Sequence, residues 1–219
     1  MGIPEDLSSF RKKVRATAAQ FPVLKLKMGS GNVDHDEAIA AIAREAAPSA
    51  ILFADANGGW SAEEAARLIP KLAAHDLKFV EQPVTHRDGI APWQELRRLL
   101  PSSPLPLFAD ESAQTSDDIP KLVGLVDGVN VKLLKCGGIR QAIHMIARAR
   151  QHHLSVMLGC MIESGIGVTA AAQLASLADW IDLDGHLYLA NDDHRGLQYD
   201  ARGQLILPDL PGLGVTPVD

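Results

Sequence analysis

The sequence has no long apolar run, and no stretch approaches the roughly 18 residues of a membrane-spanning helix. Its first residues, Met1–Asp6, combine neither a basic segment nor an apolar one, so we expect no secretory signal. Cys136 and Cys160 are the only cysteines, and no Cys/His cluster with the spacing of a zinc site accompanies them. These absences favour a cytoplasmic protein with reduced thiols and no membrane association.

A basic excess is absent as well. The chain has 21 Lys and Arg against 27 Asp and Glu, and its formal net charge is −6. The basic residues are scattered, which argues against a nucleic-acid partner. The glycine-rich phosphate fingerprint of nucleotide-binding sheets is also missing. With 219 residues, nearly half of them hydrophobic, the chain is long enough for one large domain or one α/β barrel.

Short apolar segments alternate along the chain with amphipathic ones, which is typical of strands and helices in turn. The predicted strands are Val23–Met28, Ala50–Asp55, Leu77–Glu81, Leu107–Asp110, Val129–Leu134, Ser155–Leu158 and Trp180–Leu183. The predicted helices are Leu7–Gln20, a helix from an Asp34 cap with Glu37 to Ala46, a helix from a Ser61 and Glu64 capping box to Ala74, Pro92–Leu100, Asp117–Leu122, Gly138–Gln151 and Ile166–Leu177. In the helix Gly138–Gln151, we expect a buried face made of Ile139, Ile143, Ile146 and Ala147.

This alternation predicts right-handed βαβ units and a parallel sheet. A closed (β/α)8 barrel needs an eighth strand, so either the first strand is missing or Met1–Pro4 is its remnant. A doubly wound open sheet is the alternative. Polar groups at the ends of at least five strands favour the barrel, because catalytic residues gather on its C-terminal rim. We expect one barrel domain over 1–219, with a lead-in helix in 1–22, the barrel elements in 23–184 and an irregular tail in 185–219.

Three of the predicted strands end on a carboxylate: Asp55, Glu81 and Asp110. They are about one βα unit apart, so a barrel places them side by side on one rim. Acids after strands also serve as helix caps or solvated loop residues, but three in one register are difficult to explain that way. Three hard oxygen ligands suit Mg²⁺.

Lysines lie within strands on both sides of these acids. Lys25 and Lys27 point to one face of their strand, although an edge strand with its lysines in water would show the same pattern. Lys132 is four strands further on and would face Lys27 across the barrel mouth. Lys135 falls past the strand end, and we interpret it as solvated or structural. Two lysines on opposite sides of one carbon can remove and return a proton, which is racemase or epimerase chemistry.

Five motifs in one order resemble the enolase superfamily and its muconate lactonizing enzyme-like subgroup. They are Lys-x-Lys (Lys25, Lys27), Asp-x-Asn (Asp55, Asn57), Glu-Gln-Pro (Glu81, Gln82, Pro83), Asp-Glu-Ser (Asp110, Glu111, Ser112) and Lys132 before Cys136-Gly-Gly138. The resemblance covers nearly the whole chain. It implies a Mg²⁺-dependent isomerase with Lys27 and Lys132 as acid/base groups, Asp55, Glu81 and Asp110 as metal ligands, Lys25 and Asn57 beside the substrate, and Gln82 and Glu111 supporting the ligands.

Within this subgroup the sequence is most similar to the dipeptide epimerases, of which L-Ala-D/L-Glu epimerase is the best-known type. Their Asp-x-Asp, which holds the substrate ammonium, corresponds here to Asp182 and Asp184. Glu163 and Ser164 are further candidate substrate contacts. The family also has an N-terminal α+β capping domain, and the residues before Lys25 do not contain one.

The resemblance implies a dipeptide as the small-molecule partner. Three alternatives stay open: cycloisomerase or o-succinylbenzoate synthase chemistry, N-acylamino-acid racemase chemistry, and a truncated, non-catalytic barrel. Two acids at Asp182 and Asp184 count against an anionic substrate. Open sheet edges favour association, so we also expect a homo-oligomer.

Overall fold

The computed structural model describes residues 1–218. The chain forms two compact units. The first unit comprises Met1–Ser112 and Gly124–Asp127, and the second comprises Ala113–Val123 and the chain from Gly128 onward.

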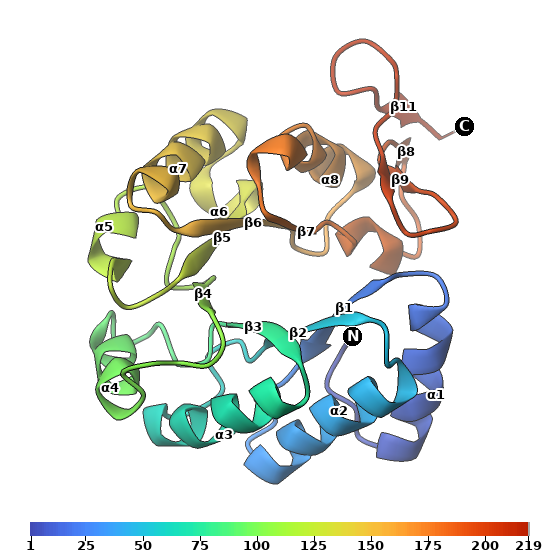
Figure 1. The fold of residues 1–219 in the computed structure, drawn as a ribbon. Helices are drawn as coiled ribbons and strands as arrows, with labels where there is room; N and C mark the ends of the chain where they lie inside the picture. The colour runs from blue at the N-terminus through green and yellow to red at the C-terminus, as the bar shows by residue number, and fades with distance from the viewer. Residues whose placement is uncertain (219) are drawn as a thin grey trace. The chain divides into compact units, whose positions relative to one another are not determined.

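The first unit is a parallel sheet of four strands in sequence order, with helices between them. Figure 1 shows its helices α2, α3 and α4 on one side of these strands. The elements in order are α1 (Leu7–Ala18), β1 (Val23–Lys27), α2 (Val33–Ala46), β2 (Ile51–Asp55), α3 (Ala62–Ala74), β3 (Leu77–Glu81), α4 (Ala91–Leu99) and β4 (Leu107–Ala109).

The second unit repeats this plan with three parallel strands, again in sequence order. Its elements are α5 (Ile119–Leu122), β5 (Gly128–Lys132), α6 (Leu133–Cys136), α7 (Ile139–Gln151), β6 (Ser155–Gly159), α8 (Gly165–Ala172), η1 (Ala175–Leu177), β7 (Trp180–Asp182), η2 (Gly185–Tyr188) and the two-residue strands β8 (His194–Arg195), β9 (Gln198–Tyr199), β10 (Leu205–Ile206) and β11 (Thr216–Pro217). A doubly wound sheet needs a reversal of strand order, and the described residues of neither unit contain one.

Met1 continues the sheet of the first unit beyond β1. Its ammonium donates to the carbonyl of Lys25 at 2.6 Å, and the amide of Lys27 donates to the carbonyl of Met1 at 2.9 Å. These two bonds are the ones that form when Met1 pairs with Leu26 in a parallel sheet. Met1 therefore pairs with β1 on the edge of the sheet where a preceding strand would lie.

The caps of α2 and α3 test the capping residues predicted from the sequence, and one of the two predictions is correct. Ser61 and Glu64 form the predicted capping box of α3. At α2 the prediction was wrong, because the cap is Asn32, whose side chain accepts the amide N–H groups of Asp34 and His35. Cap geometry requires an extended residue ahead of the first turn, and Asp34 is already helical.

The buried face of α7 is also not the predicted one. Ile139 and Ile143 are about 40% exposed. The helix instead buries a neighbouring stripe at i, i+3, i+4 and i+7, made of Ala142, Met145, Ile146 and Ala149. Small alanines permit close approach to β5 and β6, on which α7 packs, so the bulkier isoleucines were a misleading guide.

Two further boundaries differ from the sequence prediction. Leu133 and Leu134 belong to the helical turn α6 and not to the strand before it. The tail is not wholly irregular, because β8 pairs with β11 and β9 pairs with β10, each antiparallel. Both pairs are only two residues long, too short to show as strands in the sequence.

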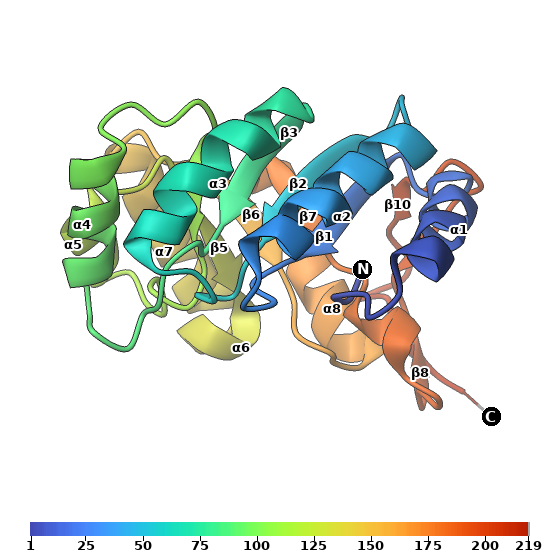
Figure 2. The ribbon, with the colours of Figure 1, turned by 90° about the horizontal axis from the view of Figure 1, so that it is seen from below.

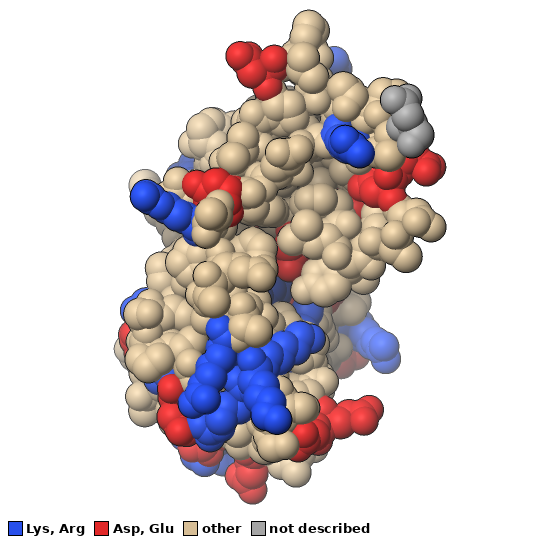
Figure 3. Space-filling model, turned by 90° about the vertical axis from the view of Figure 1, so that its right-hand side faces the viewer, with Lys and Arg blue, Asp and Glu red and all other residues tan. Residues whose placement is uncertain are grey.

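The helices of the first unit pack as a row, α1 on α2, α2 on α3 and α3 on α4, which Figure 2 shows from below. Helix α1 is on the side turned toward the viewer in Figure 3, where basic side chains gather beside acidic ones. Lys12, Lys13 and Arg15 of this helix are exposed, and Arg11 pairs with Glu45. Among the residues described, no helix is both long and apolar enough to span a bilayer.

Candidate functional site

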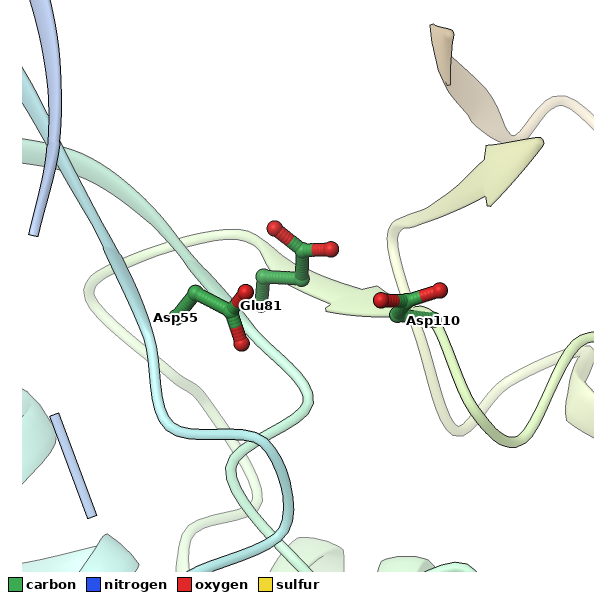
Figure 4. A group of neighbouring side chains, drawn as sticks. All are labelled: Asp55, Glu81 and Asp110. Atoms are coloured by element: carbon green, nitrogen blue, oxygen red, sulfur yellow. The ribbon is translucent and has the colours of Figure 1, made fainter. Parts of the chain in front are cut away.

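The carboxyl ends of β2, β3 and β4 carry the three predicted acids. Asp55 and Glu81 are register partners on neighbouring strands. Asp110 directly follows β4, and Figure 4 shows the three side chains gathered at these strand ends. Asp55 and Glu81 are fully buried and Asp110 is 1% exposed. The structure therefore brings together the three residues that the sequence singled out.

Below the acids lies a layer of three phenylalanines. Each is two residues before an acid, so it points to the same face of the sheet. The rings of Phe53 and Phe79 stack at 4.4 Å between centroids, and those of Phe79 and Phe108 lie 4.5 Å apart. The carboxylates thus rest on an apolar floor that offers no hydrogen-bond donor.

The acid cluster fits a divalent metal ion. One oxygen from each of Asp55, Glu81 and Asp110 lies within 4.8 Å of the other two. Three buried carboxylates on an apolar floor repel one another strongly, and hard oxygen donors of this kind are the ligands that Mg²⁺ takes in proteins. The residues present could therefore hold such an ion, which would neutralise the cluster.

Two lysines of β1 contact the same acids. The ammonium of Lys25 lies 3.0 Å from Asp55 Oδ2 and 2.8 Å from Glu81 Oε2, with its side chain 11% exposed. Lys27, whose side chain is 34% exposed, lies 2.6 Å from Asp55 Oδ2. An edge strand with solvated lysines is excluded, because both ammonium groups pair with buried carboxylates.

These lysines set the ionisation of Asp55. Burial alone would raise the pKa of its carboxyl, because a charged group is poorly solvated in the interior. The charges of Lys25 and Lys27 and their hydrogen bonds outweigh burial and hold this pKa below its usual value. Asp55 is therefore ionised at neutral pH, as a metal ligand must be.

Asn57 connects Lys27 to the end of β4. Its Oδ1 accepts the Lys27 ammonium at 2.8 Å, and its Nδ2 donates to Glu111 Oε1 at 3.0 Å. Its own amide donates to Asp55 Oδ1 at 2.9 Å. The residue adopts φ +46°, in the left-handed region that asparagine tolerates better than most residues. In the structure Asn57 therefore orients the Lys27 ammonium.

Gln82 fastens the segment that carries Asp110. Its Oε1 accepts the amides of Asp110 at 2.9 Å and Ser112 at 3.1 Å. Its Nε2 donates to the Val84 carbonyl and to the Ser112 hydroxyl, both at 2.8 Å. The fully buried side chain uses all of its hydrogen-bonding capacity. Gln82 therefore holds the backbone at Asp110 in place through hydrogen bonds to the segment Asp110–Ser112.

In the second unit, Lys132 and Asp182 lie at one level of the sheet. Lys132, 6% exposed, ends β5 and pairs in register with Gly159, which in turn pairs with Asp182. Gly159 has no room for a larger residue, because a Cβ there would lie 2.4 Å from the side chain of Asn130. The glycine at this position leaves space for the Asn130 side chain.

Lys135 has a structural role, as the sequence suggested. Its ammonium donates to the carbonyls of Asn130 at 3.0 Å and Ala113 at 3.2 Å, so it ties two backbone segments of the second unit together. Lys132 and Lys135 are therefore not interchangeable, since only Lys132 belongs to the strand.

The surroundings of Asp184 include residues that the sequence prediction missed. Burial and the nearby Asp184 carboxylate raise the pKa of Tyr188 to about 12. Burial, followed by the charges of Asp182 and Asp184, likewise raises the pKa of the Cys160 thiol to about 12, so this thiol is not reactive. Glu163 folds back on its own turn and accepts the amide of Met161 at 3.0 Å, and Ser164 precedes α8.

Sequence and structure comparisons identify the relatives of this chain. The family model described as enolase C-terminal domain-like matches residues 9–219. A hydrophobic dipeptide epimerase from Roseobacter litoralis is 41% identical over 87% of this chain and 55% of its own length. An L-Ala-D/L-Glu epimerase from Bacteroides thetaiotaomicron is 36% identical over 95% of this chain and 52% of its own. The chain thus spans about half the length of these curated relatives.

The fold of a solved relative agrees. A dipeptide epimerase from Cytophaga hutchinsonii, in complex with Mg and the dipeptide D-Ala-L-Val, superposes with a TM-score of 0.88 at 30% identity. The likeness covers 99% of this chain and 60% of that one. It confirms the predicted barrel class, and with the family model it shows that this chain belongs to the enolase C-terminal domain-like family.

Proposed function

We propose that this chain carries the barrel part of a Mg²⁺-dependent epimerase that acts on dipeptides. The observation that supports the proposal most strongly is the cluster of Asp55, Glu81 and Asp110 on its apolar floor, with Lys25 and Lys27 in contact with it. The names of the relatives agree, since they are dipeptide epimerases and one of them was solved with Mg and a dipeptide.

In the proposed reaction, Lys27 and Lys132 exchange a proton with the α-carbon of the substrate, one on each side. Mg²⁺ held by the three acids would stabilise the negative charge that develops on the substrate carboxylate as the proton leaves. Asn57 fixes the position of the Lys27 ammonium. Lys25 lies between Asp55 and Glu81, where its positive charge offsets part of the negative charge of the acid cluster.

Asp182 and Asp184 are proposed to bind the free ammonium of the dipeptide. Two carboxylates form charge-assisted hydrogen bonds with an ammonium and repel an acidic group at the same place. This pair therefore disfavours the cycloisomerase and o-succinylbenzoate synthase alternatives, whose substrates are anionic, and the N-acylamino-acid racemase alternative, whose substrates lack a free amine.

The experiment is proton exchange in D₂O. The chain is incubated with Mg²⁺ and a library of L,L-dipeptides, and deuterium uptake at the C-terminal residue's α-carbon is followed by mass spectrometry. We expect uptake with free dipeptides and little with N-acetylated ones. Preference for N-acylated substrates would assign racemase chemistry, and Mg²⁺ binding without any exchange would assign a non-catalytic barrel.

Single lysine variants test the roles within the reaction. Lys27→Ala or Lys132→Ala should stop proton removal from one epimer and leave isotope exchange from the other. Asp182→Asn and Asp184→Asn should raise KM for free dipeptides, because a charge-assisted contact to the ammonium is lost. Equal loss of exchange from both epimers in each lysine variant would contradict a two-base reaction.

A further inference from the structure

Asp36 is a fully buried carboxylate in the first turn of α2. It occupies the inward stripe of the helix, at i, i+3, i+4 and i+7 with Ile39, Ala40 and Ala43, all of them fully buried. A buried charge is costly unless it is well hydrogen-bonded, so a carboxylate on this stripe calls for an explanation.

Three N–H donors surround the Asp36 carboxylate. The amide of Gly29 donates to Oδ2 at 3.0 Å, the amide of Ser30 to Oδ1 at 3.2 Å, and the indole of Trp60 to Oδ2 at 2.7 Å. Within residues 1–218, none of these hydrogen-bond partners is a lysine or an arginine. Both oxygens accept, and an uncharged side chain of the same shape could not accept at both positions.

These donors come from two different loops. Gly29 and Ser30 follow β1, and Trp60 ends the turn that follows β2. The loops are in close contact, since a Cβ on Gly29 would lie 2.4 Å from the Ala56 carbonyl oxygen and one on Gly59 would lie 2.7 Å from the Gly29 Cα. The carboxylate therefore joins two closely packed segments. If the segments moved apart, the hydrogen bonds to Asp36 would be lost.

Both loops begin at residues of the candidate site. The first starts directly after Lys27, and the amide of Met28 donates to the Asp55 carbonyl at 2.8 Å. The second contains Asn57, which accepts the Lys27 ammonium and donates its amide to Asp55 Oδ1. The Gly58 amide holds the same turn to the Gln82 carbonyl at 2.7 Å.

We propose that Asp36 is a positioning residue that sets the relative placement of Lys27 and Asn57 by joining the loops behind them. This inference rests on the proposed function, because it assigns Asp36 a part in proton transfer by Lys27. Asp36 itself does not touch the substrate. It acts through Gly29, Ser30 and Trp60, and without it the turn that carries Asn57 loses its anchor on α2.

The test compares Asp36→Asn with Ile39→Val, a conservative change at a fully buried position one turn further along the same helix. Asparagine keeps the shape of aspartate but points an NH₂ group at an N–H donor. We expect hydrogen exchange at the amides of Asn57 and Gly58 to quicken by about tenfold or more in Asp36→Asn, whereas Ile39→Val leaves both rates unchanged.

The kinetic arm uses the dipeptide that the parent chain exchanges best. The expected loss is in kcat, about 10²-fold for a displacement near 1 Å, with KM changed much less. If Asp36→Asn lowered kcat only by destabilising the fold, other destabilising changes in the same helix would lower kcat too. Ile39→Val is such a change, and we expect it to keep its kcat. Should Asp36→Asn not fold, Trp60→Phe removes one donor and should show the same effects at smaller size.

The two proposals fail separately. A parent chain that exchanges no α-proton refutes the proposed function, and the amide exchange rates then decide on Asp36 alone. Protection at Asn57 and Gly58 that is unchanged in Asp36→Asn overturns the inference, and so does a kcat equal to that of Ile39→Val in an active protein. Faster amide exchange with a selective loss of kcat supports it.

Discussion

Replacing Lys25 with methionine should show how strongly the acid cluster depends on a cation. Its ammonium lies 3.0 Å from Asp55 Oδ2 and 2.8 Å from Glu81 Oε2. At an effective dielectric constant of about 20, one such contact amounts to about 6 kcal/mol before desolvation is subtracted. Removing one partner of a buried pair costs about 3–5 kcal/mol in practice. Because Lys27 still contacts Asp55, we expect Lys25→Met to lower the free energy of unfolding by about 3 kcal/mol.

Urea unfolding at pH 7 measures this loss, first in EDTA and then in excess MgCl₂. An ion among the three acids replaces the missing charge, and ligand at about 100 times its Kd contributes about 2.7 kcal/mol. Mg²⁺ should therefore stabilise Lys25→Met more than the parent, in which the lysine competes for the same oxygens. Lys27→Met is the matched control, and since this side chain is one-third exposed, we expect a loss of about 1 kcal/mol or less.

Two results would refute this reasoning. If Lys25→Met lost less stability in EDTA than Lys27→Met, the contacts of Lys25 with the acids would be unimportant in solution. If Mg²⁺ stabilised the parent and Lys25→Met equally, the ion and the lysine would not share the carboxylates of Asp55 and Glu81.

Acid should destabilise the first unit through Asp55. The pKa of Asp55 in the folded protein is below the ordinary value of 3.8, so its contribution to the free energy of unfolding is present above that pH and is lost as pH falls through the lowered pKa. Urea unfolding at a series of pH values should show a smaller loss of stability in acid for Asp55→Asn than for the parent. Lys135→Ala should lower the free energy of unfolding by about 1–2 kcal/mol, because two hydrogen bonds to backbone carbonyls are lost. The variant should keep isotope exchange from both epimers, whereas Lys132→Ala should abolish it from one. Equal loss of exchange in the two variants would contradict these assignments. Phe79→Ala should cost about 3–5 kcal/mol, read by thermal unfolding, because this fully buried ring stacks on two others; a loss below about 1 kcal/mol would argue against the stack. Light scattering should give a mass above the 23.5 kDa of one chain, and a stable monomer would contradict the expected association.

The acid cluster could be predicted because each strand shows its end in the sequence. An apolar run that stops on a carboxylate identifies both the strand and its functional end, as in Phe79-Val80-Glu81. Parallel pairing then places such ends on one edge without further information. The same logic identified Lys132, a charge inside an otherwise apolar strand.

Asp36 was missed although the sequence contains a signal for it. It shares its helical stripe with Ile39, Ala40 and Ala43, and an acid on an apolar stripe indicates a buried hydrogen-bonded group. The partners of that group could not be read from the sequence, because Gly29 and Trp60 meet it only through tertiary contact. The prediction of the buried face of α7 failed for a related reason. Burial in this helix depends on the surface against which it packs and not on the size of its side chains.

The stacked phenylalanines have a consequence for strand alignment. In β3, a slip of one residue would replace Phe79 and Glu81 on the inner face by Lys78 and Val80. The stack and the carboxylate would then be lost together, so the aromatic contacts that hold the core also fix where the acid points. The three acids consequently reach their places when the sheet folds, and a metal ion would find its ligands already aligned.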